Sequence, residues 1–196
     1  MAEELFRNIL LRSQKSKALV EVYSDFEDPG KFAAGFVQSV SDCDFTLGHI
    51  SPDGDTDGSL VLPISAVIRI NEDTRYLRRL SLLLKKRPSV TARKPRRSRP
   101  DPANCFIEEL QRAMQNREIV SFQIVAVDVP QTNVTGFVRK VTDSYVQIAE
   151  LNEDGEPDGM STVKIDTICQ LSRNGLDERQ IALFYRNRRK LYKESK

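Results

Sequence analysis

The feature of this sequence that most constrains its fold is an internal repeat at an offset of 101 residues. Gly35-Phe36-Val37 aligns with Gly136-Phe137-Val138, and two Asp-Gly pairs after residue 52 recur after residue 153. Between residues 35 and 71 there are 10 identities in 37 aligned positions, and most other apolar positions stay apolar. A repeat that keeps both its turn glycines and its hydrophobic pattern predicts two similar structural units.

Each copy is expected to consist of short strands between two helices. Apolar residues recur at helical spacing at both ends of each copy and alternate with polar residues in between. Gly35 and Gly136 lie inside an expected strand, where glycine is typical of a sharp bend. The helices are marked by Leu5, Phe6, Ile9, Leu80, Leu83 and Leu84 in the first copy, and at the same offset by Phe106, Ile107, Leu110, Ile181, Phe184 and Tyr185 in the second. The strands of the first copy are expected around residues 20–22, 32–41, 45–50 and 60–70.

The predicted fold class is mainly β with flanking helices. It consists of two tandem small five-stranded barrels of the SH3-like kind, each preceded and followed by a short helix. The first unit takes residues 1–84 and the second takes residues 103–196. Residues 85–102 between them are basic, contain four prolines and have no hydrophobic periodicity. Because proline removes hydrogen-bond donors and like charges repel, this segment is expected to be an extended linker.

The pattern G-F-V-x-x-V-[ST]-D-x-x-[FV]-x-[LI], which begins at Gly35 and at Gly136, resembles the Sm-like family. The hydrophobic stretch 62–70 and its counterpart 163–171 support the resemblance, which covers about residues 2–74 and 103–172. It implies a small barrel in each copy, with an N-terminal helix followed by five strongly bent antiparallel strands. The RNA-pocket signature of the family is not matched, because no asparagine follows Asp42 or Asp143 and the later Arg-Gly or Lys-Gly element is missing. The resemblance therefore carries over no RNA-binding residue.

The charges are segregated along the chain, although the formal net charge of the 196 residues is only +2. Residues 18–74 contain 11 acidic and 2 basic residues, whereas residues 75–99 contain 11 basic residues and no acidic one. Residues 118–172 are acidic again, and residues 186–196 are basic. No apolar stretch is long enough for a membrane span, and the first residues are acidic rather than signal-like. With three widely spaced cysteines, the sequence predicts free thiols and a cytoplasmic location.

Asp53, Asp55 and Asp57 reproduce the D-x-D-x-D-G opening of a calcium-binding loop. Position 12 of that loop is Ile64 rather than a bidentate glutamate, so the sequence favours a polar hairpin loop and no metal site. His49 is the only histidine, and no set of base, nucleophile and orienting group can be assembled around it. The chain is therefore expected not to be an enzyme and to need no cofactor.

Basic residues are the strongest binding candidates in the sequence. Those in the linker and in the last helix could neutralise phosphates without reading sequence. The alternative is a solvated linker that folds back on the acidic units, and a helix end whose cations meet the negative end of the dipole. The candidate nucleic-acid contacts are Arg93, Lys94, Arg96, Arg97, Arg99, Arg186, Arg188, Arg189 and Lys190.

Two functions follow as hypotheses. The first is a non-enzymatic tandem Sm-like binding module that acts in protein interaction or assembly, by binding a protein partner or by self-association. The alternative is an RNA-associated regulatory protein that uses the basic linker and the C-terminal helix. Neither hypothesis involves a membrane or a small-molecule substrate. The acidic balance of the two expected barrels disfavours phosphate and is the reason for ranking protein interaction first.

Overall fold

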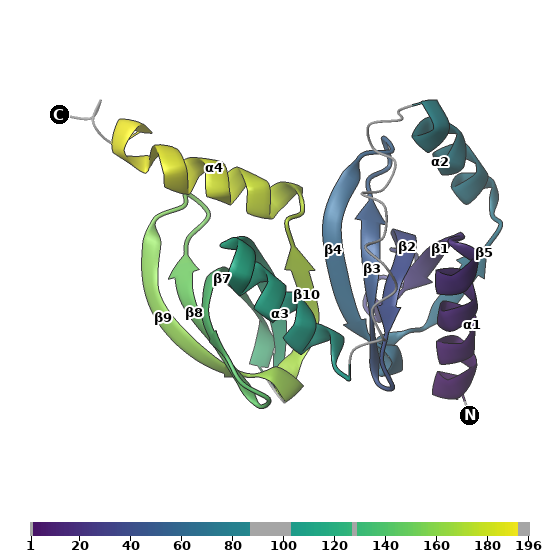
Figure 1. Cartoon of the computed structure of the whole chain (residues 1–196), viewed down its shortest axis with the longest axis horizontal. Helices are drawn as coiled ribbons and strands as arrows, with labels where there is room; N and C mark the ends of the chain where they lie inside the picture. Colours follow the sequence, from purple (N-terminus) through teal and green to yellow (C-terminus); the bar gives the residue numbers. More distant parts are fainter. Residues whose placement is uncertain (1, 87–102, 127–128, 192–196) are drawn as a thin grey trace. The chain divides into compact units, whose positions relative to one another are not determined.

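The structure is a computed structural model, which describes residues 2–86, 103–126 and 129–191. The chain divides into two compact units, residues 1–105 (unit 1) and residues 106–196 (unit 2). Each unit combines antiparallel strands with helices, so the expected class of mixed β and α structure is confirmed (Figure 1).

In unit 1 the strands pair in the order β5-β1-β2-β3-β4, and all the described pairings in this order are antiparallel. A helix precedes the strands, a 3-10 turn separates the last two, and a second helix follows them. The elements are α1 (Ala2–Ser16), β1 (Leu19–Tyr23), β2 (Ala33–Val40), β3 (Asp44–Ile50), β4 (Thr56–Pro63), η1 (Ile64–Ala66), β5 (Arg69–Glu72) and α2 (Arg75–Lys86). The first two residues of the expected linker, Lys85 and Lys86, thus end α2, and the linker from residue 87 to 102 lies outside the described residues.

Unit 2 repeats this order of elements. Its strands pair as β10-β6-β7-β8-β9, again antiparallel. The elements are α3 (Cys105–Asn116), β6 (Ile119–Ala126), β7 (Val129–Val141), β8 (Tyr145–Leu151), β9 (Pro157–Lys164), η2 (Ile165–Thr167), β10 (Ile168–Arg173) and α4 (Leu176–Leu191). In both units the fourth and fifth strands lie at opposite ends of the pairing order, so the predicted closure into a barrel is not confirmed.

The strand register shows where the two copies differ in length. Leu19 pairs with Phe36 in unit 1, and Ile119 pairs with Phe137 in unit 2, so the offset is 100 in the first strand and 101 in the second. The helix ends agree, because Lys17 and Arg117, 100 residues apart, both have φ of 54°. The alignment of the first helices at 101 is therefore wrong by one residue, since the extra residue lies between the first and second strands of unit 2.

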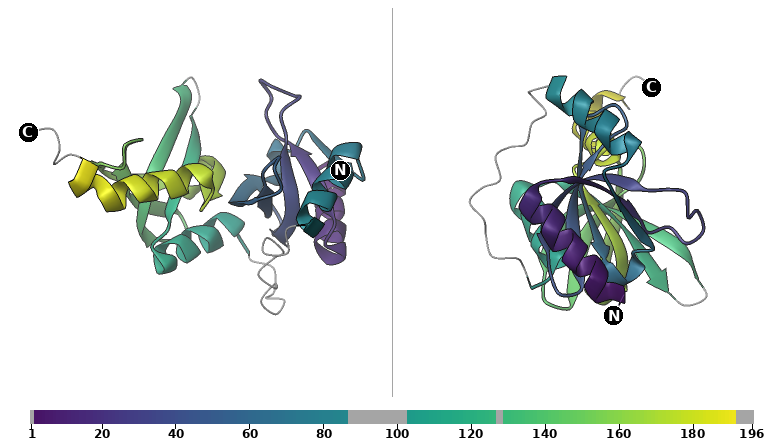
Figure 2. Two further views of the ribbon diagram at one scale, coloured as in Figure 1. Left: turned by 90° about the horizontal axis from the view of Figure 1, so that it is seen from above. Right: turned by 90° about the vertical axis from the view of Figure 1, so that its right-hand side faces the viewer.

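The two helices of unit 1 cover different faces of its sheet (Figure 2). Leu10 of α1 packs with Val20 and Val22 of β1 in the larger apolar cluster, while α2 packs on a second cluster that includes Leu19. This division follows from the alternation of side chains along a strand. The α2 cluster is formed by Ala34, Ile50, Leu77, Leu80 and Leu84, with Leu19, Phe32, Phe36 and Tyr76 at its border.

The glycines that open the repeated motif are sites of close strand approach. A Cβ atom on Gly35 would lie 2.1 Å from the carbonyl oxygen of Gly48 on β3, and one on Gly136 would lie 2.1 Å from the carbonyl oxygen of Ala149 on β8. Because the obstacle is backbone in both cases, no rotamer change can relieve it. The two strands can approach this closely only where the side chain is a hydrogen atom, which explains why the repeat keeps glycine there.

Candidate interaction surface on the last helix of each unit

The basic residues singled out by sequence are only partly described. The linker candidates Arg93, Lys94, Arg96, Arg97 and Arg99 lie outside the described residues. In α4 the side chain of Arg186 is exposed, and the Arg188 guanidinium lies 4.0 Å from the ring centroid of Tyr185 and donates a hydrogen bond to the Tyr185 carbonyl.

Arg189 and Lys190 also belong to α4, but their side chains are outside the described part of the chain. Arg188 is thus held against its own helix, and Arg186 is the described α4 candidate that faces solvent most openly.

The aspartates of the first Asp-Gly loop do not form a described metal site. Asp57 Oδ2 lies 3.1 Å from His49 Nδ1, so this carboxylate faces the imidazole across the β3–β4 hairpin. Asp53 and Asp55 are exposed, and the Asp55 amide donates to the Ser51 hydroxyl, as in a hairpin turn. Within residues 2–86, 103–126 and 129–191, no three His, Cys, Asp or Glu side chains are grouped to hold a metal ion.

The second residue of each Asp-Gly loop instead packs under the last helix of its unit. Gly54 has φ of +84°, and a Cβ atom there would lie 2.9 Å from Cβ of Leu83 on α2. Gly155 has φ of +76°, and a Cβ atom there would lie 2.5 Å from the backbone nitrogen of Tyr185 on α4. The repeated glycines therefore meet two demands at once, a left-handed turn and close contact with a helix. In Figure 1, α2 and α4 each lie near the loop that joins the third and fourth strands of their unit.

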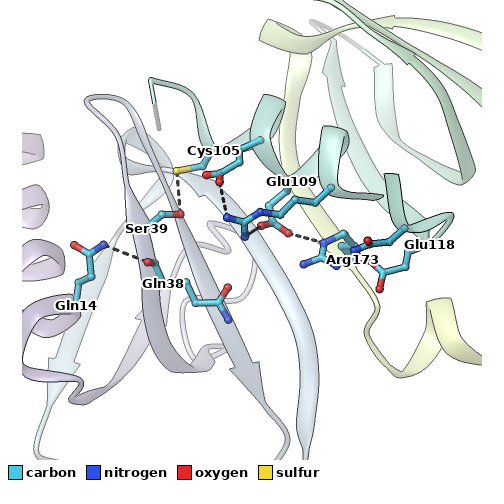
Figure 3. Close-up of polar contacts among 10 residues, drawn as sticks. Gln14, Gln38, Ser39, Cys105, Glu109, Glu118 and Arg173 are labelled. Carbon is cyan, nitrogen blue, oxygen red and sulfur yellow. Dashed lines mark hydrogen bonds and ion pairs between the residues drawn. The ribbon is translucent and has the colours of Figure 1, made fainter. Parts of the chain in front are cut away.

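The cysteines include a buried thiol that is not suited to nucleophilic chemistry. Cys105 is fully buried, and its amide donates to the Asp44 carboxylate at 2.8 Å. Its Sγ lies 3.6 Å from the Ser39 hydroxyl (Figure 3). Burial, together with the negative charge of Asp44, raises the pKa of the Cys105 thiol to about 12. Cys43 is exposed and Cys169 is partly buried, and all three cysteines are free.

Apolar side chains are exposed at equivalent positions of the last helix in both units. Leu82 on α2 is 59% exposed, and Leu183, 101 residues later on α4, is 56% exposed. The next residues, Leu83 and Phe184, are also exposed in spite of their size. Sequence reasoning expected Leu83 and Phe184 on the packed face and missed Leu82 and Leu183.

A signal for this surface was present in the sequence. Four leucines occur among residues 80–84, which is more than one helix face can bury, because consecutive residues are about 100° apart around a helix. Leu77, Leu80 and Leu84 occupy the buried side of α2, which leaves Leu82 on the opposite side. Such exposed apolar residues, recurring at one place in two units, are typical of contact surfaces.

The exposed side of α2 is strongly basic. Arg75, Arg79 and Lys86 are exposed and lie three, four or seven residues from Leu82, so they surround it on the helix surface. Arg78 is also exposed and forms a bidentate pair with Asp73, at 2.9 and 2.7 Å, which lowers the pKa of the Asp73 carboxyl. We refer to Arg75, Arg79, Leu82 and Lys86 as the outer face of α2.

No protein family matches the chain, and no curated protein or solved structure is significantly similar to it. No helix in the described part of the chain is both long enough and apolar enough to cross a membrane. The candidate surface is therefore defined by this chain's own residues.

Proposed function

We propose that this protein is a non-enzymatic interaction module built from two tandem Sm-like units, and that it binds protein through the last helix of each unit. The support for the Sm-like part is that each unit has a helix followed by five antiparallel strands, with a glycine in the second strand where the neighbouring strand approaches closely. In this proposal the protein works in a reducing cytoplasm, in keeping with its free cysteines.

The observation that carries the proposal is the recurrence of an exposed leucine at the same position in both units. Leu82 and Leu183 lie 101 residues apart, and each is more than half exposed on a helix whose other side packs on a sheet. An apolar side chain surrounded by charged residues gives a contact site both a desolvated anchor and a polar rim. On α2 the five basic residues and the absence of acidic ones indicate an acidic binding partner.

A photo-crosslinking experiment tests this function in the full chain. A photoreactive amino acid is placed at residue 82, at residue 183 or, as a control, at residue 5, where Leu5 is equally exposed on α1. The proposal predicts protein crosslinks from positions 82 and 183 that survive nuclease treatment. The crosslinks from position 82 are expected to be lost when the charge of Arg79 is reversed by Arg79→Glu. Crosslinks only to RNA, or equal crosslinking from position 5, would contradict it.

RNA binding is the second candidate function, favoured by the 11 basic residues of segment 75–99. In this alternative the linker residues and Arg186 contact phosphates, and affinity falls steeply with salt. Filter binding at physiological salt distinguishes the two functions. RNA retention that is lost on deletion of residues 87–99 supports the alternative, whereas no retention by the full chain excludes it.

A further inference from the structure

The loop between β1 and β2 presents the most exposed large apolar side chain among the described residues. Phe26 is 71% exposed, and it is followed by Glu27 and Asp28 and preceded by Asp25. Both views of Figure 2 show this loop projecting from unit 1. The loop therefore displays an aromatic ring within a group of carboxylates.

Hydrogen bonds within the β1–β2 loop fix the conformation of the backbone around Phe26. Asp25 Oδ1 accepts the backbone amides of Glu27 at 3.0 Å and Asp28 at 3.1 Å, and these amides lower the pKa of the Asp25 carboxyl. The Lys31 amide donates to the Asp28 carbonyl at 3.0 Å, which closes the far side of the loop. A loop ordered before binding loses less conformational entropy when Phe26 is immobilised by a partner.

The base of the loop is fixed to the rest of unit 1 by aromatic rings. Phe32 lies between Tyr23 of β1 and Tyr76 of α2, with centroid distances of 5.2 and 5.1 Å. The end of the loop is thus anchored, while the Phe26 side chain remains exposed. Exposure of a rigidly placed aromatic ring is the arrangement typical of an interface anchor.

We infer that the Phe26 loop of one molecule docks on the outer face of α2 of a second copy of this chain. This inference rests on the proposed function and names the partner of one of its two helices. The exposed Glu27 and Asp28 complement Arg75, Arg79 and Lys86, and the exposed Phe26 ring covers the exposed Leu82. Asp25 is paired with Lys31 within the loop at 3.4 Å and serves to shape it. Opposite charges surround an apolar contact on each side, which gives both attraction and a defined register.

Charge also argues against the simplest alternative dimer. Two α2 helices that met through their outer faces would bring Arg75, Arg79 and Lys86 together with the same residues of the other copy. Like charges placed opposite one another destabilise such a contact. Leu5 is a further exposed apolar residue with adjacent carboxylates, Glu3 and Glu4, and it provides the matched control.

Sedimentation velocity of the full chain between 5 and 500 µM tests the inference; these concentrations are about those at which weak contacts of small area are measurable. The wild type is expected to self-associate, less strongly at 0.5 M salt because screening weakens exposed charge pairs. Phe26→Ala and Leu82→Asp are each expected to weaken association about tenfold or more, and Leu5→Ala to leave it unchanged. Loss of association in Leu5→Ala, or retention in Phe26→Ala, would overturn the inference.

Mixing the two defective variants gives a sharper test. Phe26→Ala still has an intact α2, and Leu82→Asp still has an intact loop, so an equimolar mixture is expected to form mixed dimers although neither variant self-associates. Arg79→Glu and Glu27→Arg provide a second pair, which should weaken association singly and restore it together. A mixture that remains monomeric, or a double variant that is not restored, would overturn the inference.

The outcomes separate this inference from the proposed function. If the wild type is monomeric at 500 µM but position 82 still crosslinks to another protein, the second-copy inference is wrong and the interaction function stands. If association through Phe26 and Leu82 is observed but no crosslink to another protein forms, the inference stands and the module acts by self-association alone.

Discussion

The first helix of each unit is joined to the last strand by an ion pair, but the two units place the charges in opposite order. In unit 1 the helix residue Arg12 pairs with Glu72 of β5, and Ser13 donates to the same carboxylate. In unit 2 the strand residue is Arg173, which donates to Glu109 of α3 at 2.6 Å and also to Glu118. Glu72 and Arg173 are 101 residues apart, so one position of the repeat has exchanged its charge together with that of its partner.

The two connections also differ in burial. Arg12 is largely exposed, whereas Glu109 is 1% exposed and the side chain of Arg173 is 14% exposed. Figure 3 shows Arg173 beside Glu109 and Glu118. Burial disfavours the charge of Arg173, yet the carboxylates of Glu109 and Glu118 raise its pKa above its ordinary value. Both units therefore have an ion pair between the first helix and the last strand, but the positive charge can lie on either of these two elements. The contribution of the ion pair to the free energy of unfolding depends on how deeply its charges are buried.

The largest expected effect comes from removing the buried carboxylate. Glu109→Gln leaves Arg173 buried with one carboxylate fewer and is expected to destabilise unit 2 by about 3 to 5 kcal/mol. The matched change Glu72→Gln in unit 1 is expected to cost about 1 kcal/mol or less, because its partner is exposed. Peptide-resolved hydrogen exchange of the full chain measures each unit separately. Equal losses of protection in β5 and β10 would show that the two ion pairs contribute equally to stability in spite of their different burial.

Gly35 and Gly136 are expected to tolerate a side chain equally poorly, because in both units the obstacle is a backbone oxygen of the neighbouring strand. Gly35→Ala and Gly136→Ala each place a Cβ atom 2.1 Å from a backbone oxygen and should each cost about 3 kcal/mol. Gly48→Ala is the control, because its Cβ meets only the end of the Gln38 side chain, which can rotate away. Thermal unfolding of the variants ranks them, and a Gly48→Ala loss as large as that of Gly35→Ala would contradict the backbone explanation.

The loop glycines are expected to reveal a smaller difference between the units. Gly155→Ala meets the backbone of α4 and should cost about 2 kcal/mol, more than Gly54→Ala, which meets the Leu83 side chain. Gly159→Ala, at φ of +102° with no atom within 4 Å, isolates the backbone strain alone, about 1 kcal/mol. The loss of stability is measured as a loss of hydrogen-exchange protection in α4 for the unit 2 variants and in α2 for Gly54→Ala. A Gly159→Ala effect equal to that of Gly155→Ala would show that contact with the helix contributes nothing.

The smallest expected effect concerns the thiols. Cys105 has a pKa of about 12 because it is buried, so at pH 8 it should react with an alkylating agent far more slowly than the exposed Cys43. By linkage, the raised pKa favours the folded state below pH 9 and is a stabilising contribution that is lost as pH rises from about 9 towards 12. Alkylation followed by mass spectrometry measures this, with Cys43→Ser as the control. Fast modification of Cys105 at pH 8 would show that unit 1 opens readily at this residue.

Several expectations from the sequence are supported by the structure in particular residues. The expected strands around residues 32–41 and 45–50 correspond to β2 and β3, and Gly35 lies at a close approach as its position in a strand predicted. Periodicity also located α2 through Leu80 and Leu84, which are buried. These features are local, because alternation and helical spacing act between residues that are close in the chain.

Other features could not be read from the chain. A one-residue difference before the second strand of unit 2 shifts the first helices by one position, and the pairing of Leu19 with Phe36 and of Ile119 with Phe137 fixes the offset of the first strands at 100. The ion pair between Arg173 and Glu109 joins residues 64 positions apart, and no pattern in the sequence connects them. Side chains from distant segments meet only when the strands are registered.

Two similar units of strands and helices, with opposite charges in successive segments, follow from the amino-acid sequence alone. Which apolar residues remain at the surface depends on the tertiary packing. Leu82 belongs to a leucine-rich stretch that resembles a packed element in composition, and Phe26 lies in an acidic loop, yet both large apolar side chains are left exposed. Burial is a property of the whole arrangement of neighbours, because each side chain is covered or left open by residues that are far from it in the sequence.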